Sequence, residues 1–159
     1  MRGIAVAVAR QGDALSLCYR IACSPGLLHL PKQADPVRTD GLWQHTCMEA
    51  FVASADGSYC EFNLSPSGAW AAYDFASYRA GMRDRETSSP PITCQESEDF
   101  FELAATIDIS GLAGNLSLTA VVEEVDGTKS YWALAHADGK PDFHNAACFA
   151  AALPAPKEA

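Results

Sequence analysis

The sequence predicts an all-β domain, built as an antiparallel sandwich or barrel. Short segments of alternating apolar and polar residues cover most of the 159-residue chain. Turn-forming residues recur about every 8–12 positions, a spacing typical of sandwiches and barrels. No long stretch keeps the helical period of about 3.6 residues away from proline. These three observations exclude a mainly helical protein.

The turns divide the first part of the chain into four expected strands. The residues QGD at 11–13 separate a strand at 4–10 from one at 15–23. A long irregular segment with two prolines follows at 27–41. The sequence SADG at 54–57 is typical of a hairpin turn. It predicts that the two strands flanking it pair antiparallel, at 48–53 and 59–64.

The second part of the chain contains five further expected strands, at 69–78, 100–109, 116–124, 130–136 and 147–153. The polar, proline-ended segment MRDRETSSPP at 82–91 predicts a surface loop. The length suits one domain, which we expect at 1–153, followed by a flexible tail at 154–159.

The composition limits the classes of binding partner and the cellular compartment that we expect for this protein. Twenty acidic residues outnumber eleven basic ones, giving a net charge of −9 that argues against nucleic acid or an anionic membrane surface as a partner. No apolar run reaches transmembrane length, and the start MRGIAVAVARQG is too short for a secretory signal. We therefore expect a cytoplasmic protein whose six cysteines are reduced, and the absence of paired cysteine–histidine spacing disfavours structural zinc.

Residues 43–82 concentrate aromatic, carboxylate, amide and guanidinium groups, which together suit a small polar ligand. The two-residue period of a strand places Glu61 and Asn63 on one polar face. Glu49 joins that face only if the numbers of residues paired in the hairpin sum to an even value. Arg79 is either the counter-ion of one of these glutamates or a surface arginine.

Two further groups of residues are candidates for binding a ligand or a metal ion. The indole of Trp70 shares a strand face with Asp74, opposite Tyr73. The segment HADGKPDFH supplies imidazole and carboxylate groups that suit a divalent metal, although its centre is also typical of a turn. Its histidines, His136 and His144, are expected at the rim of any ligand site.

Three segments, LWQHTCMEAF, YCEFNLSPSGAWAAYDFASYR and YWALAHADGKPDFHNAACF, resemble bacterial DOMON-like domains related to family 9 carbohydrate-binding modules. The resemblance runs from about Leu15 to Leu153. It implies a jelly-roll-like antiparallel β-sandwich with two sheets of about four to five strands each. It also implies a ligand, either the end of a sugar chain or haem, on a concave face.

In the sugar-binding relatives, a tryptophan and a glutamate spaced like Trp43 and Glu49 stack on the sugar and accept its hydroxyl hydrogen bonds. This chain departs from that pattern at Thr46, where a carboxylate is common, so any role of that acid is in doubt. The structural alternative is that Trp43 plugs one end of the sandwich and Glu49 forms a buried ion pair.

The leading interpretation is a small-ligand binding module for a carbohydrate or similar polyhydroxylated compound. Its expected ligand-binding residues are Trp43, Glu49, Glu61, Asn63, Trp70 and Arg79, with His136 and His144 at the rim. Two alternatives stay open: a hydrolase that uses Glu49 or Glu61 as acid or base, and an interaction module whose polar network is structural. No cofactor is predicted, with haem and a divalent metal as open alternatives, and the sequence does not indicate an oligomeric state.

Overall fold

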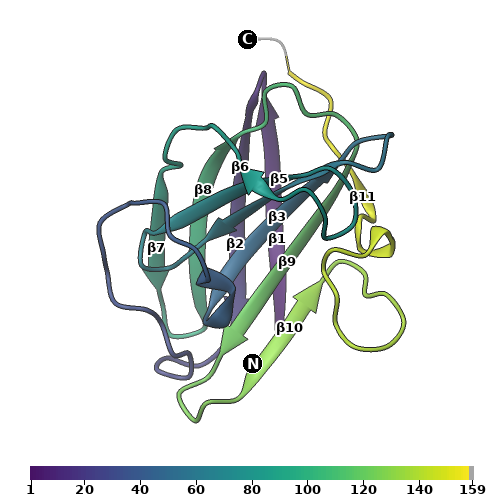
Figure 1. The fold of residues 1–159 in the computed structure, drawn as a ribbon. Helices are drawn as coiled ribbons and strands as arrows, with labels where there is room; N and C mark the ends of the chain where they lie inside the picture. The colour runs from purple at the N-terminus through teal and green to yellow at the C-terminus, as the bar shows by residue number, and fades with distance from the viewer. Residues whose placement is uncertain (158–159) are drawn as a thin grey trace.

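The computed structural model describes residues 1–157 as two packed antiparallel sheets (Figure 1). The smaller sheet has four strands in the spatial order β1 (Gly3–Gln11), β2 (Ala14–Ala22), β8 (Phe100–Asp108) and β7 (Ile92–Glu96). The larger sheet has seven strands. Six follow the order β10 (Lys129–Ala133), β9 (Asn115–Glu123), β3 (Cys47–Ala53), β4 (Tyr59–Leu64), β5 (Trp70–Phe75) and β6 (Arg83–Asp84), and β11 (Ala151–Ala152) pairs with β9.

This arrangement confirms the predicted antiparallel β-sandwich, with more strands in the larger sheet than the expected four to five. The short strand β7 was not predicted. It lies at the edge of the smaller sheet with most of its side chains exposed, so its sequence ITCQE lacks the apolar alternation of a half-buried strand. Strand β6 lies inside the segment that we expected to be a loop, and β5 ends before Ser77 because a tight turn pairs Ser77 with Ala80.

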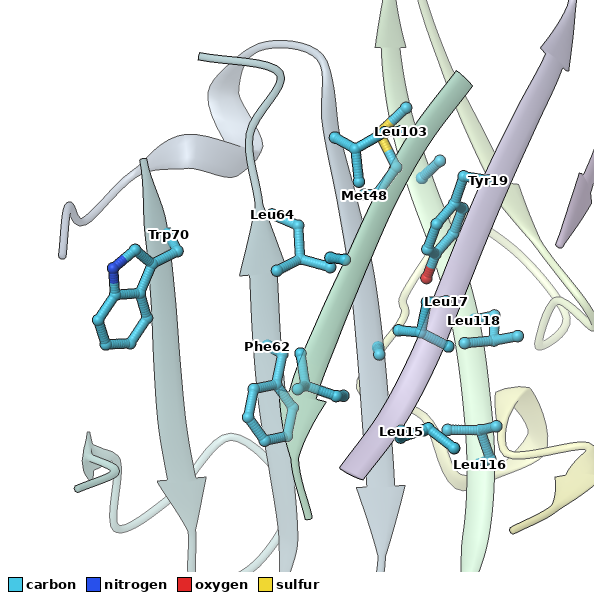
Figure 2. Close-up of a cluster of buried hydrophobic side chains, with 14 of the residues drawn as sticks. Leu15, Leu17, Tyr19, Met48, Phe62, Leu64, Trp70, Leu103, Leu116 and Leu118 are labelled. Atoms are coloured by element: carbon cyan, nitrogen blue, oxygen red, sulfur yellow. The ribbon is translucent and has the colours of Figure 1, made fainter. Parts of the chain in front are cut away.

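The main core lies between the two sheets. In β2 the buried side chains alternate with exposed ones, so Leu15, Leu17 and Tyr19 all point toward the larger sheet. Figure 2 shows these side chains facing Phe62 and Leu64 of β4 across the sandwich. The hydroxyl of Tyr19 donates a hydrogen bond of 2.6 Å to the backbone carbonyl of Glu49, which ties the core to the central strand β3.

The larger sheet is also covered on its outer face. Strands β3 and β4 are buried on both faces, which is typical of central strands rather than of a solvent-facing antiparallel sheet. A second apolar cluster there contains Phe51, Tyr73 and Phe75 from the strands together with Phe143 and Phe149 from the segment around the helical turn η2 (Ala146–Cys148). This cover allows polar side chains of the outer face to be buried as well.

Two contacts join the first strand to the C-terminal segment of the chain. Arg10 donates a hydrogen bond of 3.0 Å to the carbonyl of Pro154, next to the isolated bridge between Gln11 and Lys157. The last two positions of the expected tail, 158–159, lie outside the described residues. Within residues 1–157, no helix has the length and apolarity that a membrane crossing requires.

Candidate functional site

The hairpin register brings the predicted polar residues together. Glu49 of β3 pairs with Asn63 of β4, and the numbers 49 and 63 sum to 112, an even value. Glu49 and Glu61 therefore share the outer face of the larger sheet, diagonal to each other. Thr119 of β9 pairs with Glu49 from the other side and completes a polar row across three strands.

Glu49, Glu61 and Asn63 form the floor of a pocket of about 690 Å³ on the outer face, a volume in the range of small-molecule sites. The segment around the helical turn η1 (Leu42–Gln44) and the segment that carries Phe143 both contribute to its walls. The lining residues are Asp40, Gly41, Trp43, Glu49, Glu61, Asn63, Tyr73, Phe75, Arg79, Met82, Val121, Tyr131, Pro141, Phe143 and His144.

The two floor glutamates have strongly raised pKa values. Burial, followed by repulsion from Glu61, raises the pKa of Glu49 to about 8, opposed by a 3.1 Å hydrogen bond from the hydroxyl of Thr119. Burial likewise raises the pKa of Glu61 to about 7, opposed by the nearby Asn63 and Arg79 side chains. Neither glutamate forms an ion pair with lysine or arginine in residues 1–157, so the structural alternative in which Glu49 forms a buried ion pair is wrong.

The amide of Asn63 is fully buried at the floor. Neither its Nδ2 donor nor its Oδ1 acceptor has a hydrogen-bond partner among the described residues. A buried unpaired polar group costs about 1–3 kcal/mol, and native proteins rarely keep one without a functional reason. The Asn63 side chain lies close enough to Glu61 to lower the pKa of that carboxyl, but the amide completes no hydrogen bond of normal geometry and so leaves a donor and an acceptor for a ligand.

One wall is held by a network centred on Tyr59. The backbone amide of Arg79 donates to the Tyr59 hydroxyl at 3.1 Å, and that hydroxyl lies 2.6 Å from Nδ1 of His144. Burial, with the positive charge of Arg79, lowers the pKa of His144 to about 4, so the ring is neutral at pH 7. When Tyr59 donates to Nδ1, the neutral ring carries its proton on Nε2, which lies 3.6 Å from a carboxylate oxygen of Glu61.

Arg79 forms its ion pair with Asp142 and with neither floor glutamate. Its guanidinium donates to Asp142 at 2.8 Å, and the hydroxyl of Tyr78 donates to the other oxygen of the same carboxylate. Of the two alternatives for Arg79, the counter-ion of Glu49 or Glu61 is therefore wrong, because its side chain, which is 54% exposed, pairs with Asp142 instead. Arg79 also has a φ of 49°, and the fixed contacts of its backbone and side chain hold this unfavourable conformation.

Trp43 stands at the mouth of the pocket. It lies in η1, after Gly41 with a φ of 76°, and its side chain is 54% exposed. This exposure rules out the structural alternative in which Trp43 plugs the sandwich. Two other exposed apolar side chains, Met82 and Tyr131, line the same mouth, and such clustered exposure marks an interaction site.

Two of the eight predicted residues lie outside the pocket. Trp70 points into the core between the sheets, beside Leu64, as Figure 2 shows. The exposed ring of His136 stacks on the outside of Phe143, with ring centroids 6.2 Å apart. The remaining six line the pocket: Trp43, Glu49, Glu61, Asn63, Arg79 and His144.

The sequence prediction also missed pocket residues, of which Tyr73 is the clearest. Tyr73 pairs with Glu61 in the register of β4 and β5, which places it on the polar face, and its hydroxyl donates a 2.5 Å hydrogen bond to Asp40. The position of Phe143, by contrast, depends on a long loop that folds back over the sheet, and no local pattern indicates it.

The candidate metal ligands of the HADGKPDFH segment do not converge. Asp142 is bound to Arg79, and His144 faces Glu61 while His136 lies outside the pocket. Among residues 1–157, three metal-ligating side chains come together elsewhere, at His29, His45 and Glu123.

A comparison with solved structures supports the fold. No family model and no curated protein matches the chain. A crystal structure from Bacteroides uniformis, described as a "putative carbohydrate-binding protein", matches with a TM-score of 0.63 at 14% sequence identity. The match covers 91% of this chain and 75% of that one. At this identity the likeness shows a shared β-sandwich fold.

Proposed function

We propose that the protein binds a carbohydrate in the outer-face pocket and is related to the DOMON-like domains and family 9 carbohydrate-binding modules. The observation that carries the proposal is the unpartnered Asn63 amide between two buried glutamates at the pocket floor. The Asn63 amide can both donate and accept a hydrogen bond, and so can the two neighbouring carboxyl groups when they are protonated. Each hydroxyl of a sugar also donates and accepts, so the floor is complementary to a sugar.

The rim supplies the complementary apolar contact. The exposed indole of Trp43 offers a flat face to the C–H groups of a pyranose ring, and Tyr131 and Phe143 widen this apolar border. Polar groups at the floor and aromatic groups at the rim favour a sugar that enters end-on. The resemblance of W-x5-E to the sugar-binding relatives and the fold of the Bacteroides uniformis protein both support this assignment.

Titration calorimetry with a panel of mono- and disaccharides tests the proposal. We expect Trp43→Ala and Asn63→Ala each to weaken binding of the best sugar by roughly tenfold or more, as for buried anchor residues at other interfaces. Leu134→Ala is a matched control, because Leu134 is an exposed apolar residue that does not line the pocket. The proposal fails if no saccharide binds, or if both pocket variants bind as tightly as the control.

The raised pKa values favour glycoside hydrolysis as a second candidate. A carboxyl group that keeps its proton near pH 7 can act as a general acid, while its partner acts as base or nucleophile. Incubation of the bound sugar with the protein, followed by reducing-end quantification, distinguishes the two functions. Turnover that disappears in Glu49→Gln and Glu61→Gln would assign an enzyme, whereas binding without turnover assigns a module.

A further inference from the structure

We propose that His29, His45 and Glu123 form a binding site for a divalent transition-metal ion, Zn²⁺ by their chemistry, beyond the carbohydrate pocket. None of the three residues lines that pocket. The site lies at the end of β9 on the outer face of the larger sheet, two residues from Val121 of the pocket floor.

The donor atoms are already close to a coordination geometry. One carboxylate oxygen of Glu123 lies 2.7 Å from Nδ1 of His45 and 3.3 Å from Nδ1 of His29. The ligand atoms of the three residues all lie within 4.8 Å of one another. Donors around tetrahedral zinc, at bond lengths of about 2.0–2.2 Å, are separated by roughly 3.4 Å. Small side-chain rotations therefore suffice to accept an ion.

A fully buried hydroxyl organises the backbone of the cluster. Oγ1 of Thr46 donates to the carbonyl of His29 at 2.9 Å and accepts from the amide of Glu123 at 3.1 Å. Thr46 directly follows His45, so one side chain fixes all three ligand-bearing segments. A further backbone bond of 2.8 Å joins the amide of His29 to the carbonyl of Glu123. Such support around the ligands is what a metal site requires.

The ligand types select the class of ion. Two imidazoles and one carboxylate suit zinc and related transition metals, whereas calcium and magnesium prefer sites made of oxygen ligands. Both histidine side chains are more than half exposed, so an ion has a direct path from solvent. Three protein ligands leave a fourth position open to water.

The site has a consequence for the pocket, which rests on the proposed carbohydrate function. His45 caps η1 by donating its backbone amide to Leu42 at 3.2 Å, and Trp43 lies between these two residues. An ion bound to His45 would fix the end of the turn that carries Trp43. Metal binding should then tighten sugar binding by reducing the mobility of the indole.

Calorimetric titration of metal-free protein with ZnCl₂ tests the site. The parent should carry Cys94→Ser, which removes the exposed thiol in residues 1–157. We expect one zinc ion per chain, with affinity lowered at least tenfold in His45→Ala and in Glu123→Gln, and unchanged in the control His136→Ala. His45→Gln is a second variant if the alanine form fails to fold. Unchanged zinc affinity in the folded His45 and Glu123 variants, or no zinc binding by the parent, would overturn the proposal.

A second measurement tests the metal site independently of sugar binding. Replacing zinc by Co²⁺ should give the intense visible absorption of a tetrahedral centre, which depends on no sugar. A sugar titration with and without ZnCl₂ then tests the coupling through Trp43. Equal sugar affinity in the two titrations would overturn the coupling, and failure of every sugar to bind would leave the zinc result standing.

Discussion

The unfolding free energy of this protein should fall as the pH rises from 6.5 to 8, because two buried carboxyl groups must ionise in this interval. A carboxyl whose folded pKa is raised stabilises the fold fully below its unfolded pKa and loses that contribution as pH rises through the folded pKa. The unfolded carboxyls are already ionised at pH 6.5. Glu61, with a pKa of about 7, and Glu49, with a pKa of about 8, are still protonated in the folded protein.

The magnitude follows from about 1.4 kcal/mol per pH unit for each proton that only the folded state holds. Between pH 6.5 and 8, Glu49 therefore contributes a loss of about 2 kcal/mol and Glu61 a loss of about 1 kcal/mol. His144 opposes this loss by a few tenths of a kcal/mol, because its folded pKa of about 4 keeps it neutral while the unfolded histidine, with a pKa of about 6.5, gives up its remaining proton over the interval. The expected net loss is about 2–3 kcal/mol.

Urea denaturation at four pH values, followed by tryptophan fluorescence, measures this loss. The double variant Glu49→Gln/Glu61→Gln keeps the side-chain shapes without the charges, so its stability should stay nearly constant over the interval. Glu98→Gln, at an exposed position, should behave like the parent. The reasoning is refuted if the double variant loses as much stability as the parent between pH 6.5 and 8.

Three further predictions concern local contacts. Gly114→Ala should destabilise the fold severely, with thermal melting as the measurement, because the added Cβ would lie 1.6 Å from the carbonyl oxygen of Ala53. Tyr19→Phe should lower the unfolding free energy by about 1–2 kcal/mol in urea titrations, because it removes the buried hydrogen bond to the Glu49 carbonyl. Tyr59→Phe should leave His144 without its 2.6 Å partner, and we expect weaker sugar binding by calorimetry with a smaller effect on melting temperature.

Strand parity explains how much of the site the sequence could predict. The alternation of Glu61 and Asn63 with apolar neighbours correctly indicated one polar face of β4. The same rule puts Tyr73 and Trp70 on opposite faces of β5, and the register with β4 then decides that Tyr73 shares the polar face and Trp70 lies in the core. Trp70 was selected for its residue type, and an indole serves a core as well as a binding site.

The rest of the site depends on contacts between distant segments, which carry no local signal. Asp142 reaches Arg79 across 63 positions, and His45 reaches Glu123 across 78. The covering loop with Phe143 could not be positioned from its sequence because turn residues fix local geometry and not the surface on which a loop rests. Pairing of such segments is set by the packing of the whole sandwich.

The unpaired amide of Asn63 gives the pocket a means of rejecting the wrong molecules. An oily compound that filled the floor would leave the donor and the acceptor of the amide unpaired, and would so keep the loss of about 1–3 kcal/mol that an unpaired buried polar group carries. A molecule with a correctly placed hydroxyl avoids that loss. The Asn63 amide therefore disfavours apolar compounds, even those that contact the aromatic residues at the rim.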